Sequence, residues 1–220
     1  MKNFALFAGL LALVAGAWAA DMAVDKAPPE FSNNEPANDA TVELSWDSGS
    51  SSYGIAWYTG AGTYVGNDFN ISTVKSYPYI RTIRLYCYPS WPNGVWDGFR
   101  VGVYSFSGGV PGSMLWGPEW YVPTGSNGWK EIPVGWILPS GLKAFVPAME
   151  QYYNYPNCDP HVVDNNPTFL NHSWVYYGGT WSPNSNSTGY YNIMMRVVMD
   201  NENNPAVSPS SIGRVKALYF

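Results

Sequence analysis

Alternating apolar and polar positions mark two strands within the stretch 79–106. Side chains at every second position of a strand point to the same face of its sheet. On this basis six residues are predicted to face a buried core: Ile83, Leu85, Cys87, Phe99, Val101 and Val103. The loop between the two strands is rich in Pro, Gly, Asn and Asp and carries two tryptophans.

The same pattern predicts further short strands along most of the chain. They are expected at 41–46, 53–59, 63–71, 116–123, 129–134, 142–151, 171–177 and 190–200. Residues 107–113 are predicted to form a loop, and residues 152–169 are predicted to form a long irregular segment. Closely spaced strands with turn signals between them predict an all-β fold, an antiparallel β-sandwich of jelly-roll type with about 8–10 strands in a single domain.

The composition supports this fold class and narrows the range of partners. Aromatic residues make up 17% of the chain, which also contains 22 glycines and 18 prolines. Aromatic residues favour strands, whereas so many prolines disfavour long helices. The net charge is −5, and Lys and Arg are scattered singly. Because phosphate binding needs clustered cations, nucleic acid is not an expected partner.

The first residues have the three parts of a secretory signal peptide. Lys2 precedes an apolar run, and small residues occupy the −3 and −1 positions of a cleavage site after Ala19. Residues 1–19 are therefore predicted to be removed on export, which leaves no transmembrane segment in the mature protein. We expect the protein to be secreted or held at the cell surface.

Four segments follow the predicted cleavage site. Residues 20–39 are polar and rich in Pro and Asn, which predicts an extended arm or linker before the β-sandwich domain at 40–200. A second polar linker is predicted at 201–213. The last segment, 214–220, reads as an edge strand, as a donor strand for a neighbouring copy, or as a sorting tail.

The two cysteines, Cys87 and Cys158, allow two interpretations. In an oxidising compartment they can form one disulfide. However, Cys87 falls on the inward face of its strand, where a free thiol packs as a small hydrophobic group. The sequence leaves both alternatives open.

Residues for catalysis are sparse. The chain has no G-x-S-x-G motif, and its histidines are His161 and His172. Cys158 to His161 gathers a thiol, a carboxylate and an imidazole, but no second cluster completes a zinc site. Two carboxylates would suffice for a glycosidase, and the acids on or beside predicted strands are Glu119, Glu131 and Glu150. We predict a non-enzymatic protein and keep a glycosidase as the second alternative.

No cofactor is expected apart from a structural calcium ion. Calcium is bound in proteins by carboxylate and carbonyl oxygens. Candidate ligands in or beside turns are Asp47, Asp97, Asp159, Asp164 and Asp200. None of them forms a spaced calcium-binding loop, and each can serve simply as a turn former.

Aromatic residues in or beside loops are the clearest candidates for ligand binding. They are Trp91, Trp96, Tyr152, Tyr153, Tyr155 and Trp181. Sugar rings stack on flat aromatic side chains, and exposed aromatic patches usually serve a contact. In the alternative interpretation, these rings plug the open ends of the sandwich or contact another subunit.

Several short sequence motifs follow one another along the chain. FRVGVYS is followed by GGVPG and by GW before a strand, and later come HSWVYYGGTWSP and NIMMRVVM. In this order the sequence resembles the jelly-roll-like accessory modules of large secreted and surface proteins of Gram-negative bacteria, over roughly residues 44–199. The resemblance implies a β-sandwich fold without catalytic activity.

Together these observations predict a secreted binding or adhesion module whose ligand is a carbohydrate, such as a surface polysaccharide or glycan, or another surface polymer. The alternative is self-association as a structural subunit of an extracellular filament or coat. In that case a terminal strand, from 21–39 or 214–220, would pair with a neighbour's sheet.

Overall fold

The computed structural model describes residues 22–26, 41–71, 77–88, 97–164, 171–184 and 192–201. Within these ranges the chain forms strands and no α-helix. Nor do they contain a helix with the length and hydropathy needed to cross a bilayer. The prediction of an all-β fold is therefore confirmed.

The strands are short and follow one another closely. They are β1 (Met22–Lys26), β2 (Thr41–Leu44), β3 (Ser51–Trp57), β4 (Thr63–Asn67), β5 (Phe69–Asn70), β6 (Tyr79–Cys87), β7 (Phe99–Ser107), β8 (Val110–Tyr121), β9 (Gly128–Ile137), β10 (Ala144–Gln151), β11 (His161–Asp164), β12 (Ser173–Tyr177), β13 (Thr180–Pro183) and β14 (Met195–Asp200).

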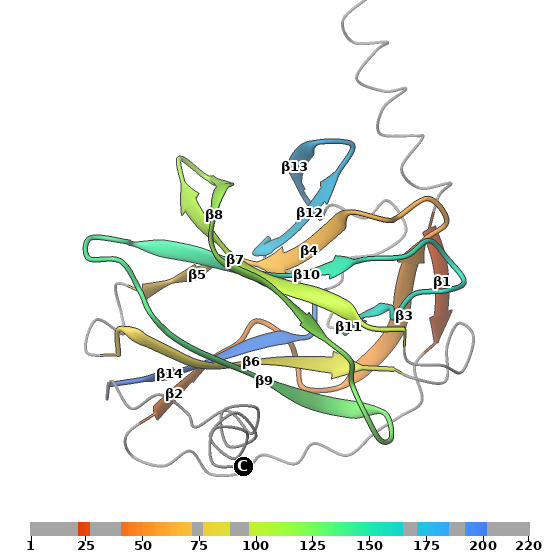
Figure 1. The fold of residues 1–220 in the computed structure, drawn as a ribbon, viewed down its shortest axis with the longest axis horizontal. Coiled ribbons are helices and arrows are strands. Elements are labelled where there is room, and N and C mark those ends of the chain that lie inside the picture. Colours follow the sequence, from red (N-terminus) through yellow and green to blue (C-terminus); the bar gives the residue numbers. More distant parts are fainter. Residues whose placement is uncertain are drawn as a thin grey trace, which may run out of the picture.

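Two antiparallel sheets form the layers of the sandwich and lie one above the other in Figure 1. The larger sheet has seven strands, in the order β13-β12-β4-β10-β7-β8 with β5 also pairing with β10. The smaller sheet has the order β2-β14-β6-β9, and a third sheet, β1-β3-β11, lies at one end of the sandwich. The predicted single-domain antiparallel sandwich is confirmed.

The core lies between the two layers and contains all six residues that the alternation predicted. Each is at most 2% exposed: Ile83, Leu85, Cys87, Phe99, Val101 and Val103. Some alternate positions on these strands, such as Tyr86 and Tyr104, are buried as well because aromatic side chains cover the outer faces, whereas Arg84 and Arg100 are half-buried. Tyr86 packs with Trp129 on one sheet, and Tyr104 packs with Trp181 on the other.

Three strands lie where the sequence analysis predicted none, which raises the number of strands above the expected 8–10. β11 is buried at all four positions, so it lacks the alternation of a half-buried strand. β1 lies inside the predicted arm and pairs antiparallel with β3, from Met22 and Trp57 to Lys26 and Tyr53. β13 is the short edge strand of the seven-stranded sheet. In addition, β8 begins at Val110, inside the predicted loop, since its exposed first half shows no apolar pattern.

Several predicted segments lie outside the described residues. They are the signal peptide at 1–19, most of the linker at 201–213 and the terminal segment at 214–220. These assignments, and the domain boundaries that depend on them, stay predictions.

Candidate functional site

A row of aromatic and charged side chains crosses the outer face of the seven-stranded sheet. Each member is the direct register partner of the next, so the row passes through six adjacent strands. From β13 to β8 its members are Trp181, Tyr176, Tyr64, Glu150, Arg100 and Trp120. Adjacent strands lie about 4.8 Å apart, so the row extends roughly 24 Å along the sheet. We call it the cross-strand row.

The alternation of β7 and β10 places this row on the outer face. Phe99 and Val101 of β7 face the core, so Arg100 between them points the other way. Likewise Met149 of β10 faces the core and Glu150 faces outward.

An ion pair forms the polar centre of the row. The Arg100 guanidinium donates from Nε to Oε2 of Glu150 at 2.6 Å and from Nη2 to Oε1 at 2.7 Å. The Glu150 side chain is only 3% exposed, whereas that of Arg100 is 34% exposed. This two-point hydrogen bond raises the pKa of Arg100 and fixes the plane of the guanidinium. Part of a well-oriented cation therefore faces solvent.

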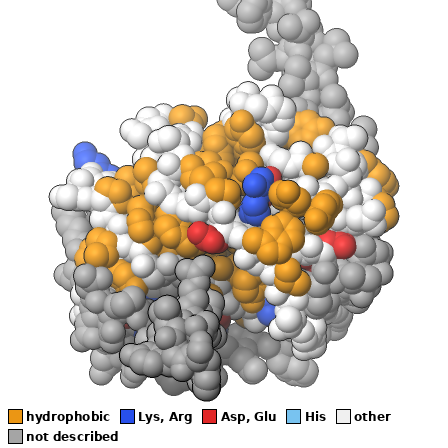
Figure 2. Space-filling view, viewed as in Figure 1, with side chains coloured by type: hydrophobic (Ala, Val, Ile, Leu, Met, Phe, Trp, Pro, Cys, Tyr) orange, Lys and Arg blue, Asp and Glu red, His pale blue; other side chains and the backbone are white. Residues whose placement is uncertain are grey.

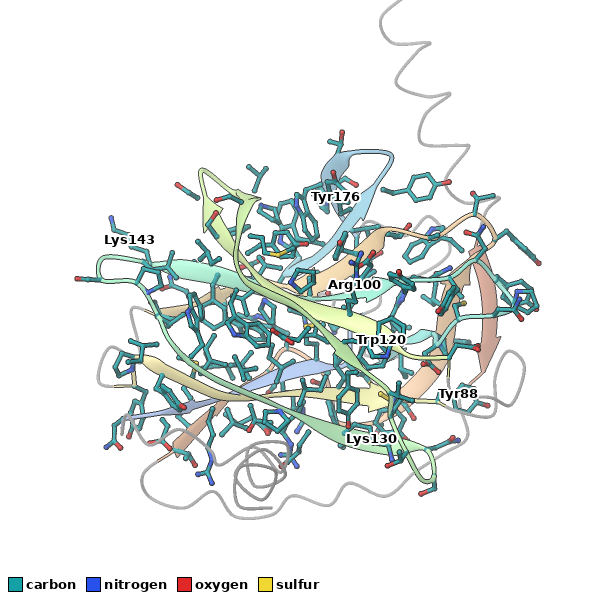
Figure 3. The ribbon with its side chains drawn as sticks, in the orientation of Figure 1. Tyr88, Arg100, Trp120, Lys130, Lys143 and Tyr176 are labelled. Carbon is teal, nitrogen blue, oxygen red and sulfur yellow. The ribbon has the colours of Figure 1, made fainter. Side chains whose placement is uncertain are left out.

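Three exposed aromatic rings gather beside Arg100, and we call them the Trp120 group: Trp120, Tyr152 and Tyr153. They are 46%, 37% and 43% exposed, respectively. The Trp120 and Tyr152 ring centroids are 5.0 Å apart, and those of Tyr152 and Tyr153 are 4.8 Å apart, both edge to face. The Arg100 Cζ atom lies 4.8 Å from the centroid of the Tyr152 ring. Figure 3 shows Arg100 on β7 and Trp120 on β8 close together.

Gly98 makes room for the Trp120 ring. Its φ is +84°, and a Cβ atom there would lie 2.5 Å from Cζ2 of Trp120. Any larger residue would meet the ring and would also strain the backbone. Gly98 additionally donates its N–H to Oδ2 of Asp159 at 2.6 Å.

The opposite end of the row is a packed cluster of rings. Trp181 lies 5.3 Å from Tyr176 and 5.2 Å from Tyr104, measured between ring centroids. Tyr64 packs edge to face on both tyrosines. Burial, followed by the charge of Glu150, raises the pKa of Tyr64. These rings are half-buried or buried, in contrast to the Trp120 group.

The seven-stranded sheet curls around this outer face. Its two edge strands, β8 and β13, contact each other, which a flat sheet of this width would not allow. Phe106 near the end of β7 packs on Trp174 of β12 at 5.5 Å between centroids. In Figure 1 the β8 and β12–β13 hairpins rise on either side of β7, β10 and β4. The face is closed at its Phe106 end, while the Trp120 group lies toward the other end of β7.

Seen from outside, hydrophobic side chains surround a basic one on the face shown in Figure 2. In the same orientation, Figure 3 identifies that basic residue as Arg100. The surface around the ion pair is therefore mainly apolar and aromatic, with one cation at its centre.

The structure brings only some of the predicted ligand-binding residues together. Tyr152 and Tyr153 lie in the Trp120 group, and Trp181 lies at the far end of the cross-strand row. Tyr155 instead packs edge to face on Tyr58 and donates its N–H to the carbonyl of Trp57. Two candidates, Trp91 and Trp96, lie outside the described residues.

Sequence reasoning missed the other members of the site. Trp120 lies in a predicted strand, so it is not among the loop aromatics that the sequence marks as candidates. Glu150 is predicted only as a candidate acid, and Arg100 is not among the predicted site residues. Their pairing depends on the register of β7 and β10, which the sequence pattern does not give.

The predicted calcium ligands mostly have protein partners. Asp47 accepts from Arg196 at 2.6 Å and from the N–H of Gly49 at 2.8 Å. Asp164 is fully buried and accepts from the N–H groups of Ser48 at 2.7 Å and Asn192 at 3.1 Å.

The remaining candidate ligands do not form a metal site either. Asp159 accepts from the N–H of Gly98, and burial, together with the charge of Asp97, raises the pKa of Asp159. Asp200 lies 3.7 Å from Arg81. Among the described residues no group of three or more His, Cys, Asp or Glu side chains is placed to hold a metal ion. Structural calcium stays a prediction.

Both cysteines are buried free thiols, so the structure shows the unbridged one of the two alternatives. Burial raises the pKa of Cys158 to about 12 and raises that of Cys87 as well. Thiols with such pKa values are neutral and poorly reactive. His161 is buried against Trp57, with 4.6 Å between ring centroids, and burial lowers its pKa to about 3.

The three acids considered for a glycosidase do not share a face. Glu150 is paired with Arg100 on the outer face of the larger sheet. Glu119 is the register partner of Val101, whose side chain faces the core, so it points away from Glu150. Glu131 belongs to β9 of the smaller sheet and lies 3.4 Å from Arg84.

Comparison with known proteins supports the fold. No protein-family model and no curated protein match the sequence. A crystal structure of the cysteine protease and lectin-like domains of Cwp84, a surface-layer-associated protein of Clostridium difficile, is similar with a TM-score of 0.54 at 13% identity. The match covers 76% of this chain and 37% of that chain.

A second structure, of the clostridial cysteine protease Cwp84 after propeptide cleavage, gives the same TM-score of 0.54 at 14% identity and covers 76% of this chain and 42% of that chain. This chain thus corresponds to less than half of either structure. At such low identity the likeness shows a shared fold alone. The resemblance to accessory modules of Gram-negative bacteria is not confirmed by these comparisons.

Proposed function

We propose that the protein is a non-enzymatic glycan-binding module that acts at the cell surface. The observation that carries the proposal is the Trp120 group, three exposed rings placed beside the Arg100–Glu150 ion pair. Large exposed aromatic side chains are uncommon unless they contact something, and here they surround an oriented cation.

The chemistry of the group suits a sugar. The flat rings of Trp120 and Tyr152 offer apolar faces on which the C–H groups of a pyranose can stack. The guanidinium of Arg100 has donors that Glu150 does not occupy, and these can bind hydroxyl oxygens. Because Glu150 holds the guanidinium in place, little side-chain entropy is lost on binding.

The similar structures give independent support. Their shared fold corresponds to the lectin-like part of a surface-layer-associated protein rather than to its protease. A carbohydrate ligand and a surface location for the present chain agree with that likeness. The predicted signal peptide points to the same location.

Binding assays on a panel of soluble and insoluble polysaccharides test this proposal. The chain from residue 20 onward should bind at least one of them. Trp120→Ala and Tyr152→Ala should weaken that binding about tenfold, which corresponds to about 1.4 kcal/mol. Ile137→Ala is the matched control, because Ile137 is 47% exposed but belongs to the smaller sheet. Binding to no polysaccharide, or equal binding by all three variants, would overturn the proposal.

A second candidate function is self-assembly through strand pairing, and the position of β1 favours it. β1 is an edge strand that pairs with β3, and it starts just after the predicted cleavage site. A strand of this kind can pair instead with β3 of a neighbouring copy. Size-exclusion chromatography with light scattering tests this: assemblies that vanish when residues 20–26 are deleted would support it, and a monomer at every concentration would overturn it.

A further inference from the structure

The cross-strand row reaches well beyond the Trp120 group. That group covers one end of a line that continues through Tyr64 and Tyr176 to Trp181. Measured along the curled sheet, the line is roughly 24 Å long at the usual spacing between strands, a path that exceeds a single sugar ring several times. Aromatic rings lie at both ends, and the ion pair lies between them.

The charges of the row cancel. Arg100 is the row's single cation and Glu150 its single anion, and they are bonded to each other. The chain as a whole carries a net charge of −5, which repels polyanions. The row therefore favours a ligand without charge over an acidic polymer.

The curvature of the sheet also suits a long ligand. The contact between β8 and β13 curls the outer face, so the two ends of the row turn toward each other. A chain lying across the strands would then touch Trp120 and Trp181 at once. A small ligand at the Trp120 group would leave the Trp181 end untouched.

We propose that the cross-strand row binds an extended, uncharged glycan chain that runs across the strands, with one sugar stacked at Trp120 and another at Trp181. This inference rests on the proposed function and adds the length, charge and direction of the ligand. Chains with equatorial linkages remain extended and present both apolar ring faces, whereas axially linked chains coil. Cello- and chito-oligosaccharides are therefore the appropriate probes, with malto-oligosaccharides as the coiled comparison.

Calorimetric titration of the mature chain with each series, from the monosaccharide to the hexasaccharide, tests the proposal. In one of the two extended series, the affinity should rise about tenfold or more between the disaccharide and the hexasaccharide, which equals about 1.4 kcal/mol. Trp181→Leu should remove that gain and leave disaccharide binding unchanged, whereas Trp120→Leu should weaken both.

A measurement on the unsubstituted protein tests the same claim without depending on the folding of these variants. In a ¹⁵N-labelled sample, the disaccharide should shift the indole N–H signal of Trp120 alone. The hexasaccharide should shift the signals of both Trp120 and Trp181.

The outcomes separate this inference from the proposed function. An affinity that stays constant beyond the disaccharide, or an unmoved Trp181 signal, would overturn the extended-chain proposal while a glycan site at Trp120 stands. Preferential binding of alginate, an acidic polymer, would overturn the assignment of an uncharged ligand. Failure of every glycan to bind would overturn both proposals.

Discussion

The carboxylate of Glu150 lies beneath an aromatic surface and receives two hydrogen bonds from Arg100, at 2.6 and 2.7 Å. The acid is almost fully buried, and its basic partner is one-third exposed. The pair therefore serves two purposes: it neutralises a buried charge, and it orients a cation toward solvent. The contribution of this charge neutralisation to stability can be measured without knowing the ligand.

Removing the cation should destabilise the fold. Arg100→Ala leaves the Glu150 carboxylate buried without this partner, so we expect a loss of about 2 kcal/mol in the free energy of unfolding, below the range for fully buried pairs because Arg100 is partly exposed. Arg100→Lys should lose less, and adding Glu150→Gln to Arg100→Ala should recover part of the loss. Urea denaturation measures all three. An unchanged midpoint for Arg100→Ala would contradict this view of the pair.

Gly98 and Gly62 offer a matched pair of substitutions. Both have a φ of +84°, but a Cβ on Gly62 would meet nothing within 4 Å, whereas one on Gly98 would meet the ring of Trp120. Replacement by Ala should cost each about 1 kcal/mol of stability through backbone strain. Only Gly98→Ala should also change Trp120 fluorescence and weaken glycan binding. Equal effects of the two substitutions on binding would show that the packing of Trp120 against Gly98 does not affect glycan binding.

Two buried groups should give the stability opposite pH dependences. Burial lowers the pKa of His161 from 6.5 to about 3. Between these two pH values the imidazole is protonated in the unfolded chain and neutral in the folded protein. Burial raises the pKa of Asp159 to about 6, so here the folded protein holds a proton that the unfolded chain has released above about pH 4. As the pH falls from 6 to 4, His161 therefore destabilises and Asp159 stabilises the fold, each by up to about 1.4 kcal/mol per pH unit.

Single substitutions should separate these two effects. Relative to the unsubstituted protein, His161→Phe should gain stability as the pH falls through this window, and Asp159→Asn should lose it. Urea denaturation at several pH values between 6 and 4 provides the measurement. Three parallel profiles would show that neither group titrates as described.

Asp164 should be among the most sensitive polar positions of the fold. Its buried carboxylate accepts from Ser48 and Asn192, and so joins the segment after β2 to the segment before β14. Asp164→Ala removes the shared acceptor of Ser48 and of the buried Asn192 and should destabilise the protein by about 3 kcal/mol, whereas Asp164→Asn should cost less. Thermal melts with and without added calcium measure this loss. A calcium-dependent melting temperature that Asp164→Ala abolishes would instead support the predicted structural calcium.

The sequence predicted those parts of the fold that depend on local alternation. Ile83, Leu85 and Val101 follow the two-residue period of a half-buried strand, and all three lie in the core. β11 could not be found in this way, because a strand buried on both faces shows no period. β1 could not be found either, since its pairing with β3 is a tertiary contact.

The candidate site was predictable only in part, for a related reason. Tyr152 and Tyr153 lie in a loop-like stretch, and their aromatic character alone marked them. Trp120 becomes part of the site only through the register of β7 and β8, which pairs it with Arg100. Tyr64 joins the row through β10, a strand distant in the sequence. Composition carries no information about such alignments.

Hydroxyl-radical footprinting, read out by mass spectrometry with and without a bound glycan, tests the central claim most directly. If the outer face of the seven-stranded sheet is the binding surface, oxidation of Trp120, Tyr152 and Tyr153 should fall when the glycan is present. Trp129, on the outer face of the smaller sheet, should be oxidised to the same extent in both samples. Unchanged oxidation of Trp120 together with protection of Trp129 would contradict the account.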